Sequence, residues 1–172
     1  MRALILSAVV VVVCLGGVVE AADLAVSTRG AMNALSNSSI SPPNLKWSRE
    51  KVFGHVVHRA VTSDGECVLE LYGEPMVEEA SVMFLLTTNE GKSLRNVSVV
   101  SLALLVFAPR WDGSVDWFER AMLNTMGYMR RGVAVPRQVK NLKGRNVGLG
   151  ITKSGDRYTR AILLVTVDEI EK

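Results

Sequence analysis

Two histidines are the first residues in this sequence whose types and spacing suggest chemistry. His55 and His58 are three residues apart, and on a helix that spacing places both imidazole rings on one face, where they can share a metal ion. The residues around them favour a strand instead, on which the two side chains point to opposite faces. No nearby cluster of Cys, Asp or Glu supplies a third ligand. We therefore expect no metal site and interpret both histidines as surface or interface residues.

Two other motifs match catalytic signatures only in part. Ser48 precedes Lys51 by three residues, as in some acyl-transfer enzymes, but the Ser-Asp-Asn and Lys-Thr-Gly segments that accompany that motif are absent. Residues 150–155 begin and end with glycine, but a phosphate loop continues with Lys and then Ser or Thr, whereas Asp156 and Arg157 follow here. We therefore predict no catalytic residue and no cofactor, and we interpret the second segment as part of a hairpin.

The strongest functional signal is a local surplus of positive charge. Residues 22–129 carry a formal net charge of −3, whereas residues 130–160 contain nine basic residues and one acidic residue, a net of +8. A surplus of this size can create a positively charged surface. The predicted anion- or partner-binding residues are Arg130, Arg131, Arg137, Lys140, Lys143, Arg145, Lys153, Arg157 and Arg160. The alternative interpretation is a solvated hairpin that binds nothing.

Four aromatic residues could form a shelf for a ligand. Trp117 and Tyr128 are eleven positions apart, which returns to the same side of a helix. They flank a stripe of Phe and Met residues, and this pattern is more typical of a buried helix face than of a binding site. We therefore favour core packing for these two rings and for Trp47 and Trp111.

The first 21 residues are typical of a secretory signal peptide. Arg2 is followed by an apolar run from residue 3 to residue 19, and small residues follow at Ala21 and Ala22. We predict cleavage after Ala21 and a periplasmic or extracellular location, and the Val-rich leader favours a bacterial source. The alternative is an uncleaved N-terminal membrane anchor. Arg2 would stay inside in that case as well, so the domain would again lie outside the cytoplasm.

Removal of this leader would leave Cys67 as the only cysteine. A single thiol cannot form an internal disulfide, so the fold must rest on a packed core. Cys67 lies in an apolar strand pattern, and we expect it to be buried; pairing with a second chain is the alternative. With 48% hydrophobic and 22% charged residues, the 172-residue chain has the composition of a globular protein and not of a disordered one.

The rest of the chain predicts an α+β fold. Residues 22–45 are rich in Ser, Asn and Pro and are interpreted as a flexible lead-in to a single domain over residues 46–172. We predict an antiparallel sheet of about five strands with two consecutive helices packed on one face, in the order β-β-β-α-α-β-β. Predicted strands cover residues 52–61, 66–72, 80–88, 147–151 and 158–167, and predicted helices cover residues 94–108 and 114–131. Ser114 is expected to cap the second helix, and a helix is expected to pack against the strip without side chains at Gly148 and Gly150.

These observations favour a small exported binding or interaction protein without catalytic activity. Its basic C-terminal face would contact an anionic envelope polymer, lipid head groups or an acidic protein, and no nucleic acid is expected as a partner outside the cytoplasm. The alternative is a small exported hydrolase with an unidentified active site. A concave pocket with a nucleophile or paired carboxylates beside a base would distinguish the enzyme from the binding protein.

Overall fold

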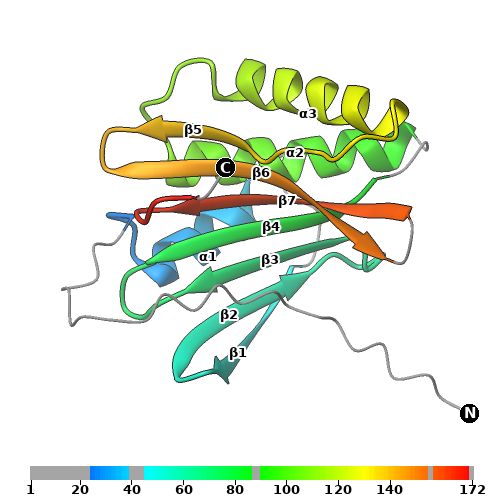
Figure 1. Cartoon of the computed structure of the whole chain (residues 1–172). Coiled ribbons are helices and arrows are strands. Elements are labelled where there is room, and N and C mark those ends of the chain that lie inside the picture. Colours follow the sequence, from blue (N-terminus) through cyan, green and yellow to red (C-terminus); the bar gives the residue numbers. More distant parts are fainter. Residues whose placement is uncertain (1–23, 39–44, 87–89, 155–156, 171–172) are drawn as a thin grey trace, which may run out of the picture.

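The computed structural model describes residues 24–38, 45–86, 90–154 and 157–170, which form an α+β fold with one seven-stranded antiparallel sheet and three helices (Figure 1). The helices are α1 (Thr28–Asn37), α2 (Glu90–Phe107) and α3 (Ser114–Arg130). The strands are β1 (Lys46–Val52), β2 (His55–Val61), β3 (Cys67–Tyr72), β4 (Glu79–Leu85), β5 (Gln138–Leu142), β6 (Arg145–Ser154) and β7 (Arg157–Thr166). They are arranged in the order β1-β2-β3-β4-β7-β6-β5, so β4 and β7 pair at the centre although both helices α2 and α3 separate them in the sequence.

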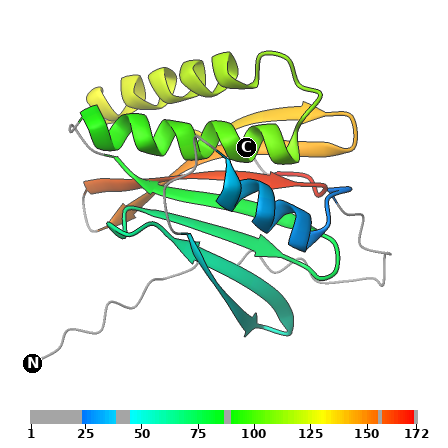
Figure 2. The ribbon, with the colours of Figure 1, turned by 180° about the vertical axis from the view of Figure 1, so that it is seen from behind.

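The three helices of the described segments lie on one side of the sheet, and none of them covers its other face (Figures 1 and 2). Figure 2 shows α1 and α2 in front of the sheet, with α3 beside α2. One row of directly paired residues crosses five strands and is buried in the core on the helical side: Ala60, Leu69, Val82, Leu163 and Leu149. Because apolar burial is the main favourable contribution to folding, this row holds the two layers together.

The α+β class is confirmed, whereas the numbers of strands and helices and the element order differ from the prediction. The strand expected over residues 52–61 is the end of β1 together with all of β2, because the chain turns at Phe53 and Gly54. Both residues have a positive φ, 48° and 88°, which is characteristic of a two-residue type I′ hairpin turn. The edge strand β5, which pairs with β6, was also not expected.

Helix α1 is a further element that the sequence did not predict. It lies in residues 24–38, within the stretch interpreted as a flexible lead-in over residues 22–45. Ser27 caps this helix, since its hydroxyl accepts a hydrogen bond from the Gly30 amide (3.1 Å). Leu35 is fully buried in the core. Residues 24–38 are therefore part of the folded domain.

Hydrogen bonds connect this N-terminal part to the sheet and to the residues beside it. The Leu24 amide donates to the Val77 carbonyl (2.8 Å), and the Trp47 indole in β1 donates to Ser36 Oγ in α1 (2.9 Å). Both contacts join segments that are distant in the sequence, so they fix where α1 lies. The predicted signal peptide, residues 1–21, lies outside the described residues.

The ends of α3 agree with the prediction at one terminus only. Ser114 is the first residue of the helix and is buried, and the preceding Gly113 is the N-cap, with a φ of 102° and no side-chain cap. The predicted cap at Ser114 is therefore wrong. At the other end Gly132, with a φ of 67°, donates its amide to the Met129 carbonyl (3.0 Å), as expected for a helix that stops at glycine.

The glycine strip in β6 faces away from the helices, so the predicted helix packing there is wrong. Residues on either side of Gly148 belong to the buried helical side, which places both glycines on the uncovered face. A Cβ added at Gly148 would lie 3.1 Å from Ile170 Cδ1, and one added at Gly150 would lie 3.5 Å from Arg137 Nε. The strip is therefore occupied by two side chains from neighbouring segments.

Candidate anion-binding pocket

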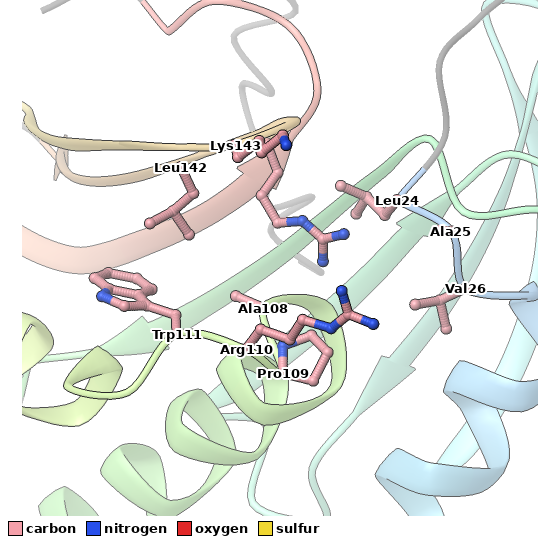
Figure 3. Close-up of a pocket in the computed structure, with 10 residues that line it drawn as sticks. Leu24, Ala25, Val26, Ala108, Pro109, Arg110, Trp111, Leu142 and Lys143 are labelled. Atoms are coloured by element: carbon pink, nitrogen blue, oxygen red, sulfur yellow. The ribbon is translucent and has the colours of Figure 1, made fainter.

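A cavity of about 540 Å³ opens at one end of the sheet, where three segments that are distant in the sequence meet. Its walls come from residues 24–26, from residues 108–111 between α2 and α3, and from Leu142, Lys143 and Arg145 around the β5–β6 turn (Figure 3). A concave site of this size is typical of pockets that bind small molecules.

Three positively charged side chains line this cavity, and none of its lining residues is acidic. They are Arg110 from the α2–α3 connection and Lys143 and Arg145 from the β5–β6 turn. Figure 3 shows the Arg110 guanidinium group extending into the space between the α2–α3 connection and residues 24–26. Within the described part of the chain, no carboxylate pairs with Arg110 or Lys143.

The third cation, Arg145, is held in place by the end of α2. Its Nη1 atom donates a hydrogen bond to the carbonyl of Phe107, the last residue of that helix. The carbonyl end of a helix carries partial negative charge, which favours a cation at this position. The Arg145 side chain is half-buried, so its guanidinium group is both oriented and partly shielded from water.

Apolar residues form most of the remaining wall. The Trp111 ring packs against the Trp117 ring, with centroids 5.3 Å apart and an interplanar angle of 52°, and Leu24 is fully buried behind the cavity. Ala25 has a φ of 55°, a conformation that residues with a Cβ adopt at a cost. Backbone strain of this kind clusters at binding and active sites. The cavity thus combines an apolar surface, a strained wall and three cations.

The basic residues singled out in the sequence are not brought together. Lys143 and Arg145 lie at the pocket, at the start of β6, whereas Lys153 and Arg157 lie at the β6–β7 turn, at its other end. A ten-residue strand rises about 3.3 Å per residue, so roughly 30 Å separate these two pairs. The hairpin therefore spreads its charge over both ends of the sheet.

Three further basic residues lie away from the pocket. Arg130 and Arg131 are at the C-terminal end of α3, where the Arg131 guanidinium carbon lies 4.9 Å above the centre of the Tyr128 ring. Of these two arginines, Arg131 therefore has an interaction with an aromatic ring of its own helix. Lys140 is exposed on the edge strand β5.

The last two predicted basic residues lie on the uncovered face of the sheet. Arg137 lies against Gly150, and Arg160 donates from Nη1 to Met83 Sδ (3.4 Å). Of the nine predicted residues, only two line the cavity. Arg110, the third cation there, is outside residues 130–160 and could not be found by counting charge along the chain.

The two histidines lie on opposite faces of β2, as the strand interpretation requires. His55 is exposed, whereas His58 is buried on the helical side, which corrects its assignment to the surface. The Nε2 atom of His58 is 3.9 Å from Glu74 Oε1. Among the described residues, no three His, Cys, Asp or Glu side chains are placed to hold a metal ion.

A buried carboxylate, Glu70, lies on the uncovered face of the sheet and is fully engaged. It accepts hydrogen bonds from Arg59 Nε (2.7 Å), Tyr72 Oη (3.1 Å) and Ser81 Oγ (3.5 Å). Burial and the charge of Glu70 raise the pKa of the Tyr72 phenol. A buried carboxylate whose oxygens are engaged by this many donors has a structural role and is not available as a base for a substrate.

Comparison with known proteins adds no family to these observations. The chain matches no protein-family model, no curated protein and no solved structure. None of the helices in the described segments combines the length and the apolar character that crossing a membrane requires. The chemistry of the pocket therefore has to be argued from its own residues.

Proposed function

We propose that this protein is a non-catalytic binding module whose pocket takes an anionic group carried on an apolar body. The observation that supports the proposal most directly is the convergence of Arg110, Lys143 and Arg145 on one cavity without an acidic residue among its lining. Arg110 and Lys143 are exposed and Arg145 is half-buried, so the three charges together create a local positive potential that would attract an anion to the cavity.

The apolar wall indicates the rest of the ligand. Val26, Trp111 and Leu142 contribute apolar surface around the cations, and Leu24 is buried behind it. Sites of this composition hold a ligand by apolar contact and orient it through a few polar groups. A carboxylate or a phosphate monoester attached to an acyl or aryl group has both an anionic group and an apolar body. Molecules of this class occur in cell envelopes.

The pocket supports binding better than hydrolysis. Hydrolysis requires a nucleophile with a base beside it, or paired carboxylates. The lining residues include no Ser, Thr, Cys, His, Asp or Glu. The proposed location outside the cytoplasm rests separately on the apolar leader over residues 3–19 and would be tested by sequencing the N-terminus of the protein recovered from its host.

The binding proposal is tested by calorimetric titration with decanoate and decyl phosphate, with decanol as the uncharged probe of similar length. We expect both anions to bind more tightly than decanol, and binding to weaken as salt is raised. The double variant Arg110→Gln, Lys143→Gln should lose at least about tenfold in affinity, because a hydrogen bond to a charged group contributes about 1.5–3 kcal/mol. Arg145 stays unchanged, since its removal would also expose the end of α2.

Lys140→Gln is the matched control for this experiment. It removes one exposed positive charge from the adjacent strand β5, three residues from Lys143 and outside the pocket lining. This variant should bind both anions like the wild type. Failure of both anions to bind, equal binding of decanol, or an equal loss in Lys140→Gln would each contradict the proposal.

A further inference from the structure

The turn between β1 and β2 displays an aromatic side chain in a conformation that does not suit it. Phe53 is 81% exposed, the largest exposure among the large hydrophobic residues that the structure describes. Its φ is 48°, and it occupies the first central position of a two-residue turn in which Val52 pairs directly with His55. At this position Asn, Asp or Gly is strongly preferred, and a bulky residue with positive φ is an outlier.

Neither property of Phe53 contributes to the stability of the fold. An exposed ring gains nothing from burial, and the left-handed backbone conformation carries a steric cost for a residue with a Cβ. Strained residues of this kind are concentrated where a protein makes functional contacts. The turn therefore has the features of a contact point with another surface.

The position and charge of the turn indicate which surface this is. Both views place the β1–β2 turn at the edge of the molecule farthest from α2 and α3, so it can touch a flat surface before the rest of the domain does (Figures 1 and 2). Residues 51–56 contain three apolar side chains, Lys51 and no acidic residue. Further along the hairpin, Glu50 pairs with Arg59, and Arg49 pairs with Glu74 from the connection between β3 and β4.

We propose that the β1–β2 turn is a membrane-docking tip that inserts Phe53 into the interface of an anionic lipid bilayer. A single convex aromatic side chain requires no shaped cavity in a bilayer, where aromatic rings are favoured at the level of the head groups. Lys51, which has no acidic partner among the described residues, would interact with anionic head groups. This tip is independent of the pocket, whose lining it does not share.

Fluorine NMR of the full chain with 4-fluorophenylalanine locates the contact. The chain has four phenylalanines, of which Phe84, Phe107 and Phe118 are buried and serve as internal controls. We expect vesicles of phosphatidylcholine with 30% phosphatidylglycerol and a nitroxide-labelled lipid to broaden the Phe53 signal at least several-fold more than the other three. This readout depends on where Phe53 lies, and not on whether residues 3–19 also hold the chain on the membrane. Equal broadening of all four signals, or none, would overturn the proposal.

The variant Phe53→Asn distinguishes loss of the membrane contact from loss of the fold, because the first lowers only vesicle affinity and the second would also lower the urea midpoint. Because Asn suits the turn, its urea midpoint should equal or exceed that of the wild type, while its affinity for the anionic vesicles should fall at least tenfold. Lys51→Gln should lower that affinity about fivefold, and vesicles of phosphatidylcholine alone should show no difference between Lys51 and Gln. If Phe53→Asn binds the vesicles as well as the wild type, the proposal is wrong. It is also wrong if the wild type forms dimers and Phe53→Asn does not, because the turn would then be a contact between two copies of the chain. The pocket variant Arg110→Gln, Lys143→Gln should keep the Phe53 contact, so the two proposals can fail separately.

Discussion

Replacing Leu35 with Ala measures how firmly the N-terminal helix belongs to the fold. Leu35 is fully buried in a core cluster that contains residues of α2 and of the sheet. Its truncation removes apolar contacts and leaves a cavity that the surrounding elements, fixed by the sheet, can close only in part. Leu→Ala changes at such sites cost about 2–5 kcal/mol of unfolding free energy. An N-terminal segment that only rested loosely on the domain would lose almost nothing.

The measurement is urea unfolding of the wild type and of two variants. With a urea dependence of about 2 kcal/mol per molar, Leu35→Ala should lower the midpoint by about 1–2.5 M. Leu123→Ala in α3 is the control, since it makes the same substitution within a helix at a side chain that is 68% exposed, and it should change stability by no more than about 0.5 kcal/mol. If the two variants are equally stable, α1 is not packed as described, and the lead-in interpretation of residues 22–45 is restored.

Two further predictions concern buried ionisable groups. Burial raises the pKa of the Cys67 thiol to about 12, so the native protein should react at this position with a thiol reagent far more slowly than the protein in denaturant. Rapid labelling of native Cys67, followed by mass spectrometry of the peptide, would contradict its burial. Burial, with the charges of Asp168 and Glu70, raises the pKa of Glu79 from 4.5 to about 7, so the folded state keeps a proton that the unfolded state releases. Stability should therefore fall by up to about 3 kcal/mol as pH rises between these values, and Glu79→Gln should remove that fall; the same pH dependence in the variant would refute the assignment.

The elements with strong periodic patterns could be predicted from the sequence, whereas those that depend on tertiary contacts could not. Helix α3 has apolar residues at helical spacing, and β6 and β7 have the alternation of a hairpin with one buried face. Helix α1 has only ten residues, including two Asn and one Ser, and Ala31 and Leu35 are its main apolar contacts with the core. Such a short helix is stabilised by packing and not by its own propensity, so its composition resembled that of a linker.

The β1–β2 turn was missed for a different reason. Gly54 alone is a weak turn signal, and Phe53 in front of it is among the residues least expected in a left-handed conformation. The sequence around it therefore looked like one continuous strand. Turn preferences of individual residues predict a turn only where the sequence follows them, and Phe53-Gly54 does not follow the preference of a type I′ turn for Asn, Asp or Gly at its first position.

The same limit applies to the pocket. Its three cations come from positions 110, 143 and 145, and they meet only because the β5–β6 turn lies beside the end of α2. The charge surplus of residues 130–160 is real, but β6 separates its two turns, so a surplus along the chain does not become a patch in space. Counting charges along the sequence indicated the sign of the charge at the site. It could not indicate that Arg110 is the third cation there.

Two independent departures from local backbone preference coincide with the two contact regions proposed for this protein. Among the described residues, Ala25 and Phe53 are the non-glycine residues with positive φ, and they lie in the pocket wall and at the tip of the β1–β2 hairpin. Ala25 lies between two backbone hydrogen bonds that hold its segment, from the Leu24 amide to the Val77 carbonyl and from the Val77 amide to the Val26 carbonyl, whereas the Phe53 ring is exposed and no packing explains its conformation. At Phe53, a positive φ that packing does not explain, on an exposed aromatic ring, is what a contact with an external partner would account for.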